Sequence, residues 1–143
     1  IAHHYDYIFI DCPPSLGLLT VNALCAADCV IVPLQCEFYA LEGLSQLMRT
    51  IEMVQQRLNR NLVVQGIVLT MFDGRNKLSE MVANDVRSHF GKLVYRTVIP
   101  RNVRISEAPS FGQPVLLYDL KCAGAQAYVA LASELLSQEK EAA

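Results

Sequence analysis

Residues 63–100, which read VVQGIVLTMFDGRNKLSEMVANDVRSHFGKLVYRTVIP, alternate between two hydrophobic patterns. Residues 63–71 form a short, nearly continuous apolar run, which is typical of a strand that is covered on both faces. Apolar side chains then recur every three or four positions over residues 78–90, as on one face of a helix. A second short run over residues 94–99 ends at Pro100, which cannot donate to a strand ladder. The stretch therefore predicts a strand, a helix and a second strand.

The rest of the chain repeats this alternation. Residues 7–10 and 29–34 are apolar runs too short for buried helices, so both are predicted to be strands. Helical spacing is found over residues 41–58 and 125–140, and a shorter apolar helix is expected over residues 16–27. Parallel neighbours need a crossover, which is usually a helix. We therefore expect an α/β fold with a doubly wound, mostly parallel sheet and flanking helices.

The length and composition of the chain limit the class of protein to which it can belong. The chain has 143 residues and is 52% hydrophobic, and no linker or repeat divides it, so we expect a single domain over residues 1–143. Its apolar stretches fall short of the roughly 18 residues that a membrane span needs, which predicts a soluble, cytoplasmic protein. The formal net charge is -2, so any attraction to nucleic acid must come from a local patch. The five cysteines include no C-x-x-C pair, which favours reduced core residues over metal ligands.

An acidic residue follows the first apolar run. Asp11 comes directly after residues 7–10 and precedes Pro13 and Pro14, which would end the strand. Ligands of parallel sheets bind beyond the carboxyl ends of the strands, where a carboxylate can hold hydrated Mg²⁺ beside a nucleotide phosphate. A strand-terminal Asp is also a common turn residue, so this residue alone leaves both interpretations open.

Longer stretches of the sequence resemble a known family. In chain order they are YDYIFIDCPPSLGLLTVNAL (residues 5–24), VPLQCEFYALEGL (residues 32–44), GIVLTMFDGR (residues 66–75) and VIPRNVRISEAPSFGQPV (residues 98–115). From about Tyr5 to about Leu136 the chain resembles the ParA/Soj ATPases that partition chromosomes and plasmids. The resemblance implies a P-loop NTPase-like fold with ATP or ADP and Mg²⁺ as cofactors, and dimerisation on ATP. It also implies non-specific binding to nucleoid DNA and a ParB-like partner that stimulates release.

The resemblance further implies roles for individual residues. Asp11 matches the acid that contacts Mg²⁺ through water, and Pro13 and Pro14 fall in the switch II segment that follows. Residues 16–27 match part of the dimer face. The residues that match the wall of the adenine site are Thr70, Met71, Pro100 and Asn102. A flat apolar slot with backbone polar groups suits a purine, although ordinary strand-end packing explains Met71 and Pro100 equally well.

Two arginines match the family's non-specific DNA contacts. These are Arg75, in the Asp-Gly-Arg block, and Arg104, in the Pro-Arg-Asn-Val-Arg block. Arginine suits this task because its fork pairs with phosphate oxygens without reading bases. Further basic residues could widen the patch, although unrelated surface charges explain them more simply: Arg96, Arg101, Lys77 and Lys92.

The family's phosphate-binding loop has no counterpart among these 143 residues. Gly91-Lys92 is followed by Leu93, so it does not fit the G-x-x-x-x-G-K-[ST] pattern. We expect the loop and the switch I aspartate upstream of Ile1, and we assign no catalytic residue and no bound cofactor to this chain. The family's strand order would place the missing first strand between residues 7–10 and 29–34. Their exposed edges are expected to pair with each other or with a second copy, which predicts self-association.

Two other functions fit the same alternation of strands and helices. A MinD-like division-site ATPase would end in a basic amphipathic helix on a membrane, whereas the tail from Ser137 is small and acidic and the arginine blocks favour DNA. A non-catalytic doubly wound binding module would use Asp11 only as a strand-tip acid.

The absence of the phosphate-binding loop generates a first prediction. Phosphoryl transfer depends on positioned donors and a metal ion, so the 143-residue chain is expected not to hydrolyse ATP. Phosphate release from the purified chain should equal that of a protein-free blank. Release above the blank that disappears in Asp11→Ala would show the prediction to be wrong.

Overall fold

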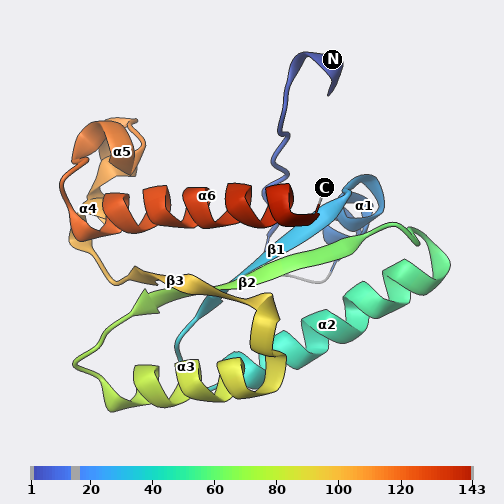
Figure 1. Cartoon of the computed structure of the whole chain (residues 1–143), viewed down its shortest axis with the longest axis horizontal. Helices are drawn as coiled ribbons and strands as arrows, with labels where there is room; N and C mark the ends of the chain where they lie inside the picture. Colours follow the sequence, from blue (N-terminus) through green and yellow to red (C-terminus); the bar gives the residue numbers. More distant parts are fainter. Residues whose placement is uncertain (1, 14–16, 143) are drawn as a thin grey trace. The chain divides into compact units, whose positions relative to one another are not determined.

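The structure is a computed structural model, and it describes residues 2–13 and 17–142 (Figure 1). The strands are β1 (Cys29–Gln35), β2 (Val63–Phe72) and β3 (Val94–Pro100). The longer helices are α1 (Leu18–Ala26), α2 (Ala40–Arg57), α3 (Lys77–Phe90) and α6 (Ala123–Ala142). Short helical segments complete the order: η1 (Ala2–His4), η2 (Gly91–Leu93), α4 (Val103–Glu107), η3 (Ala108–Phe111) and α5 (Val115–Tyr118).

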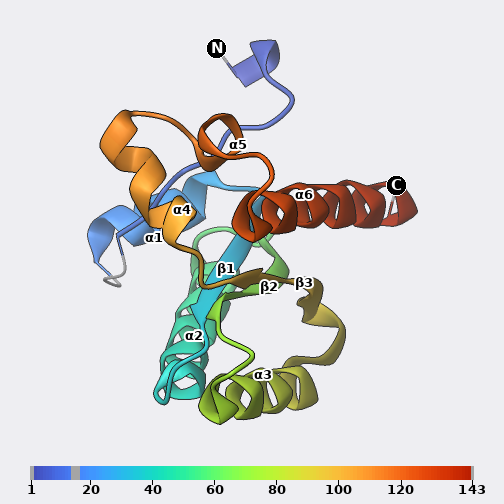
Figure 2. The same cartoon turned by 90° about the vertical axis from the view of Figure 1, so that its left-hand side faces the viewer.

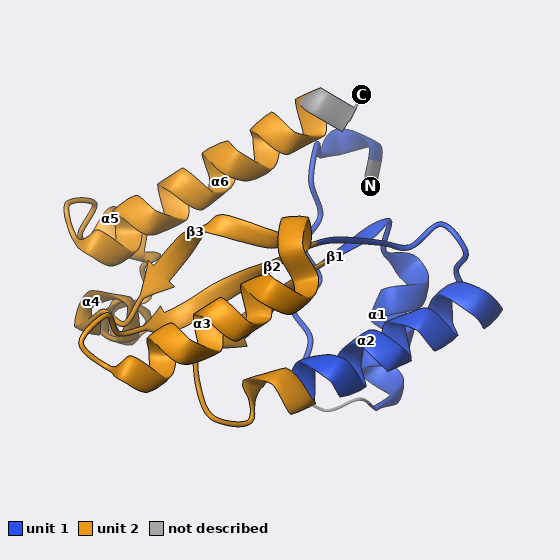
Figure 3. Ribbon diagram, turned by 60° about the horizontal axis from the view of Figure 1, so that its bottom comes forward, with its two compact units in different colours: residues 1–30, 43–65 blue, residues 31–42, 66–143 orange. Residues whose placement is uncertain are grey.

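The chain divides into two compact units (Figure 3). Unit 1 comprises residues 1–30 and 43–65, and unit 2 comprises residues 31–42 and 66–143. Unit 1 contains α1 and most of α2. Unit 2 contains α3, β3 and everything that follows, together with the carboxyl-terminal parts of β1 and β2.

In unit 1 a single amide side chain holds the end of α1. Asn59 Nδ2 donates to the carbonyl oxygens of Leu24, Cys25 and Ala27 at 3.1, 3.3 and 2.8 Å. The last carbonyls of a helix have no partner within the helix, so Asn59 satisfies groups that α1 leaves open. The loop after α2 thereby fixes the carboxyl end of α1.

Unit 2 is built on a parallel sheet with helices on both faces. The strand order is β1-β2-β3, and β2 pairs in parallel with β3. Figures 1 and 2 show α6 on one face of the strands and α3 on the other. Val68, Tyr95 and Ile99 form a buried cluster, against which Leu131 and Leu135 of α6 pack. The expected α/β fold with a mostly parallel sheet and flanking helices is confirmed.

The glycine inside β2 has a packing role. A Cβ atom on Gly66 would collide with the ring of Tyr95, which is almost completely buried. The break that Gly66 makes in the apolar run of β2 therefore marks a close approach of the β2 backbone to an aromatic ring.

The pairing of β2 with β3 shifts register twice. Ile67 lies opposite Val94 and Leu69 lies opposite Val98, so β3 contains extra residues between these pairs. The backbone N–H groups of Arg96 and Thr97 donate instead to the Glu134 carboxylate of α6, at 2.8 and 2.9 Å. Partial burial acts to raise the pKa of this carboxyl, but the hydrogen bonds from Thr97 and Arg96 outweigh it and hold the pKa below its ordinary value.

The second shift lies near the end of β2. Phe72 lies opposite Pro100, so β2 has the extra residue in this interval. Met71 falls there with a φ of 52°, in the left-handed region that L side chains seldom adopt. The shift thus leaves a strained residue next to the carboxyl edge of the sheet.

One predicted strand is wrong. Residues 7–10 form no strand, and their side chains stay exposed, with Phe9 at 83%. A strand needs a ladder partner, and in the described part of the chain the only sheet is β1-β2-β3, which residues 7–10 do not join. The other three strands and the four longer helices lie within about two residues of the predicted ranges; Leu16, where one predicted helix begins, lies outside the described residues.

The contact between Glu134 and β3 predicts an acid-sensitive stability. Glu134→Ala should lower the free energy of unfolding by about 1–3 kcal/mol, because two backbone donors lose a charged acceptor. The folded-state pKa of Glu134 is lowered, so its contribution is complete above the ordinary pKa and is lost as the pH falls through the folded-state value. Urea unfolding of wild type and variant from neutral to acidic pH should therefore show a difference that shrinks toward low pH.

Ser133→Ala is the matched control, because the Ser133 hydroxyl donates within α6 itself, to the Val129 carbonyl at 3.0 Å. Equal stability of the two alanine variants would contradict the role given to Glu134.

The positive φ of Met71 predicts an unusual order of stabilities. Met71→Ala and Met71→Gly both remove the contacts of the side chain, but only glycine adopts this φ without strain. Met71→Gly should therefore be more stable than Met71→Ala by about 1 kcal/mol in thermal or urea unfolding. The opposite order, which is usual within a strand, would show that the backbone here is not left-handed.

Candidate functional site

The carboxyl ends of β2 and β3 bring two polar loops to the same edge of the sheet. The Thr70 carbonyl accepts from the N–H of Cys36 at 3.2 Å, and the Phe72 carbonyl accepts from the N–H of Arg101 at 2.9 Å. These bonds fix the segments that follow β1 and β3 against the end of β2. Parallel strands end at one edge, where ligands of α/β sheets usually bind.

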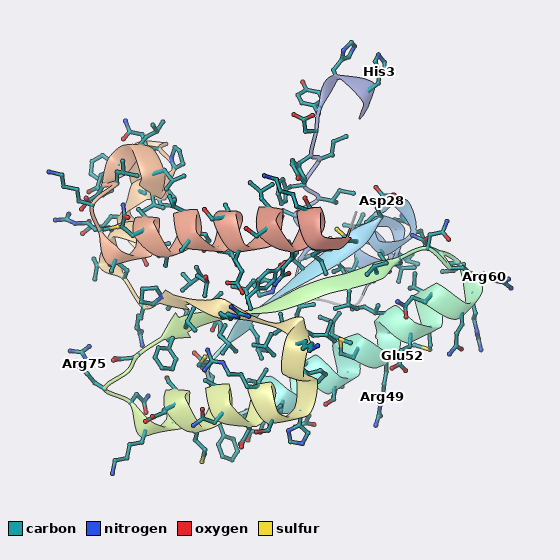
Figure 4. All side chains as sticks on the ribbon, viewed as in Figure 1. His3, Asp28, Arg49, Glu52, Arg60 and Arg75 are labelled. Atoms are coloured by element: carbon teal, nitrogen blue, oxygen red, sulfur yellow. The ribbon has the colours of Figure 1, made fainter. Side chains whose placement is uncertain are left out.

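The loop after β2 is held together by the carboxylate of Asp73, which belongs to the same loop. Asp73 Oδ1 accepts from the backbone N–H of Arg75 at 3.0 Å and from Arg75 Nε at 3.1 Å, and Oδ2 accepts from Nη2 at 3.2 Å. The hydrogen bond from Arg75 lowers the pKa of the Asp73 carboxyl and raises that of the guanidinium. The Arg75 side chain is nevertheless 92% exposed, and Figure 4 shows it pointing away from the loop into solvent. Arg75 is thus a paired but accessible cation.

The loop after β3 is organised by Asn102. Its Oδ1 accepts from the N–H of Arg104 at 2.9 Å, which caps the start of α4. This bond fixes the backbone of Arg104 close to the end of β3. One lone pair of the Asn102 oxygen is therefore engaged, and the Nδ2 group is the donor that this side chain can offer to a ligand.

The Arg104 guanidinium contacts two carboxylates. Nη1 donates to Glu107 Oε2 at 2.9 Å, and Nε lies 3.5 Å from Asp119 Oδ2. The hydrogen bond to Glu107 is the largest influence that raises the pKa of Arg104. The side chain is 52% exposed, so Arg104 is more restrained and less accessible than Arg75.

Four of the predicted site residues gather at this edge. Thr70 and Met71 lie in β2 just before Phe72, Pro100 ends β3 opposite Phe72, and Asn102 follows as the cap of α4. All four side chains are at least partly accessible. Their contact with adenine stays a prediction.

The predicted magnesium ligand lies in unit 1. Asp11 and Pro13 are exposed in a segment without regular secondary structure, and Pro14 lies outside the described residues. Among the residues that the structure describes, no three His, Cys, Asp or Glu side chains gather as a metal site. A single exposed carboxylate nevertheless suits Mg²⁺, which keeps several waters and binds through one or two carboxylates and the phosphates of a nucleotide.

Sequence reasoning missed the two carboxylates that contact Arg104. Glu107 follows Arg104 by three positions, and such pairs are neighbours on a helix, so this contact had a detectable signal. Asp119 lies beyond the end of α5, and its approach depends on how the short helices fold back. The further basic residues that could widen the patch are all exposed: Arg101, Lys77, Lys92 and Arg96.

Comparison with known sequences points to one group of proteins. A family model described as an AAA domain matches residues 1–64. The chain is 70% identical over 137 residues to the chromosome partitioning protein ParA of Caulobacter vibrioides, covering 96% of the chain and 51% of that protein. It is 56% identical over 135 residues to the sporulation initiation inhibitor protein Soj of Bacillus subtilis, covering 94% and 53%. The chain thus spans about half the length of these relatives.

Solved structures with the same arrangement include nucleotide-bound proteins. Cobyrinic acid a,c-diamide synthase of Mycobacterium smegmatis, with bound ADP and magnesium, is 40% identical with a TM-score of 0.71, covering 93% of the chain and 47% of that protein. The cell division ATPase MinD of Pyrococcus furiosus is 26% identical with a TM-score of 0.76, covering 94% and 53%. The sequence relatives share far more identity with the chain than MinD does. The chain therefore belongs to the ParA/Soj family of chromosome-partitioning proteins.

Proposed function

We propose that the chain acts in chromosome or plasmid partitioning as part of a ParA/Soj-type ATPase that binds DNA non-specifically. The observation that carries the proposal is the pair of arginines, Arg75 and Arg104, displayed after adjacent parallel strands in a chain that is 70% identical to a partitioning protein. Such a protein would work in the cytoplasm on the nucleoid. Its other partners would be a second copy of itself and a ParB-like centromere-binding protein.

The strand-end residues support nucleotide binding in the complete protein. Asp11 would hold Mg²⁺ through water, and Thr70, Met71, Pro100 and Asn102 would line the adenine. Asn102 Nδ2 is the natural donor toward a purine ring nitrogen, because the Asn102 oxygen already accepts from Arg104. Bound Mg²⁺ would neutralise phosphate charge. The bound ADP and magnesium of the Mycobacterium smegmatis structure, which has the same fold, support this assignment.

The electrostatics of the chain suit non-specific rather than sequence-specific DNA binding. With a formal net charge of -2, attraction must come from the local cations of the sheet edge. Arg75 and Arg104 are presented by loops and a one-turn helix, and neither lies on a long helix that would fit a major groove. Guanidinium groups presented in this way contact the phosphates of DNA, so they do not distinguish one base sequence from another.

A MinD-like action on membranes is the second candidate, because the MinD structure matches the fold with a TM-score of 0.76. No helix in the described ranges is long and apolar enough to span a membrane. The end of α6 carries Glu139 and Lys140, whereas helices that lie on membranes are rich in Lys and Arg on the polar face. The two arginines at the sheet edge and the 70% identity to a partitioning protein make DNA binding the stronger proposal.

The proposal predicts DNA binding that weakens with salt and depends on the two arginines. Fluorescence anisotropy with random-sequence duplex DNA should show affinity that falls linearly in a logarithmic plot against salt. Arg75→Glu should weaken binding roughly 10-fold, and Arg104→Glu should weaken it by less, because the Arg104 guanidinium is more restrained and less exposed. Each reversal should lower the slope of that plot by about 1 for each phosphate that the protein no longer neutralises.

Arg49→Glu is the matched control, since Arg49 is an exposed arginine of α2 and its replacement changes the net charge equally (Figure 4). If all three reversals weaken binding equally, the effect is one of net charge, and the sheet edge is not the DNA surface. Binding to anionic lipid vesicles but not to DNA would instead support the MinD-like alternative.

A further inference from the structure

The Arg104 guanidinium lies beside two carboxylates, whose combined negative charge exceeds its own positive charge. Its Nη1 donates to Glu107 Oε2 at 2.9 Å, and its Nε lies 3.5 Å from Asp119 Oδ2. One positive and two negative groups leave a local charge of about -1. Arg75 differs because a single carboxylate, Asp73, pairs with it. The two arginines of the proposed DNA surface are therefore electrostatically unequal.

Both carboxylates are held in place by further contacts. The Tyr118 hydroxyl donates to the Glu107 oxygen that Arg104 also contacts, at 3.3 Å, and the Tyr118 ring stacks on Phe111 with centroids 5.1 Å apart. Asp119 Oδ1 accepts from the N–H of Lys121 at 3.2 Å. Neither carboxylate is free to swing away from Arg104 without breaking another hydrogen bond, so the arrangement is part of the folded α4–α5 segment.

A DNA phosphate must compete with this arrangement. Nη1 and Nε face carboxylates, so a phosphate reaches the remaining N–H groups against the repulsion of two fixed negative charges. A fork of N–H groups gives its strongest phosphate contact when two parallel donors are available together. At Arg104 the fork formed by Nε and Nη2 becomes available to a phosphate only when Nε turns away from Asp119.

We propose that Glu107 and Asp119 form a carboxylate clamp that weakens the contact of Arg104 with DNA phosphates. The clamp rests on the proposed function, in which Arg104 meets DNA. It makes Arg104 the attenuated contact of the pair and Arg75 the stronger one. Glu107 and Asp119 thus act through Arg104 and touch no DNA themselves.

The clamp is tested with charge-neutral variants that preserve shape. Glu107→Gln and Asp119→Asn should each tighten binding of the protein to random-sequence duplex DNA roughly 2- to 5-fold, the range of an exposed ion pair, and the double variant should tighten it further. Asparagine keeps an oxygen for the N–H of Lys121, so the fold of the segment is preserved. Glu52→Gln, at an exposed position of α2, controls for the change in net charge.

The same variants in an Arg104→Ala background test the clamp separately from the assumption that Arg104 contacts DNA. Glu107→Gln should then have no more effect than Glu52→Gln, because the clamped group is gone. The clamp is overturned if Glu107→Gln in the wild-type background weakens DNA binding or changes the affinity no more than Glu52→Gln does. Weaker DNA binding by Arg104→Glu would still support the DNA surface in that case. If Arg104→Ala binds DNA as wild type does, the assignment of Arg104 to DNA fails, and the clamp fails with it.

Discussion

The parallel pairing of β2 with β3 is the constraint on which the rest of unit 2 depends. It buries Val68, Tyr95 and Ile99 in one cluster and ends with Phe72 opposite Pro100, so that both strands stop at the same edge. The loop that carries Arg75 and the helix that carries Arg104 start from that edge. The proposed DNA surface depends on this strand direction, since antiparallel neighbours would send the two loops to opposite ends of the sheet.

The irregularities of this pairing are as informative as its regular part. The first register shift directs two backbone N–H groups of β3 to Glu134, which fastens α6 to the edge strand through hydrogen bonds as well as through apolar packing. The second leaves Met71 at a positive φ beside the predicted adenine wall. Strained backbone is often retained next to binding sites.

The sequence predicted most of the regular structure because the signals are local. Apolar runs and helical spacing place β1 to β3 and the long helices within about two residues. Residues 7–10 have the same apolar pattern yet form no strand. An apolar pattern gives a segment only a preference for the strand conformation, whereas a strand forms when a partner strand is available to pair with it. The short helices between residues 103 and 118 follow prolines and capping residues, and their contacts with Arg104 depend on tertiary folding. Arg75 and Arg104 were predictable as cations, and the spacing of Glu107 from Arg104 also gave a signal, but the approach of Asp119 to Arg104 depends on tertiary folding.

The proposed DNA surface requires the guanidinium groups of Arg75 and Arg104 to meet DNA phosphates directly. NMR observation of the arginine Nε–H signals during titration with a short random duplex reports on each guanidinium separately. We predict that the Arg75 and Arg104 signals shift with added DNA and return with salt, while those of Arg49 and Arg60, on α2 and the loop that follows it, stay in place (Figure 4). Shifts at Arg49 and Arg60 with none at Arg75 and Arg104 would contradict this placement of the DNA.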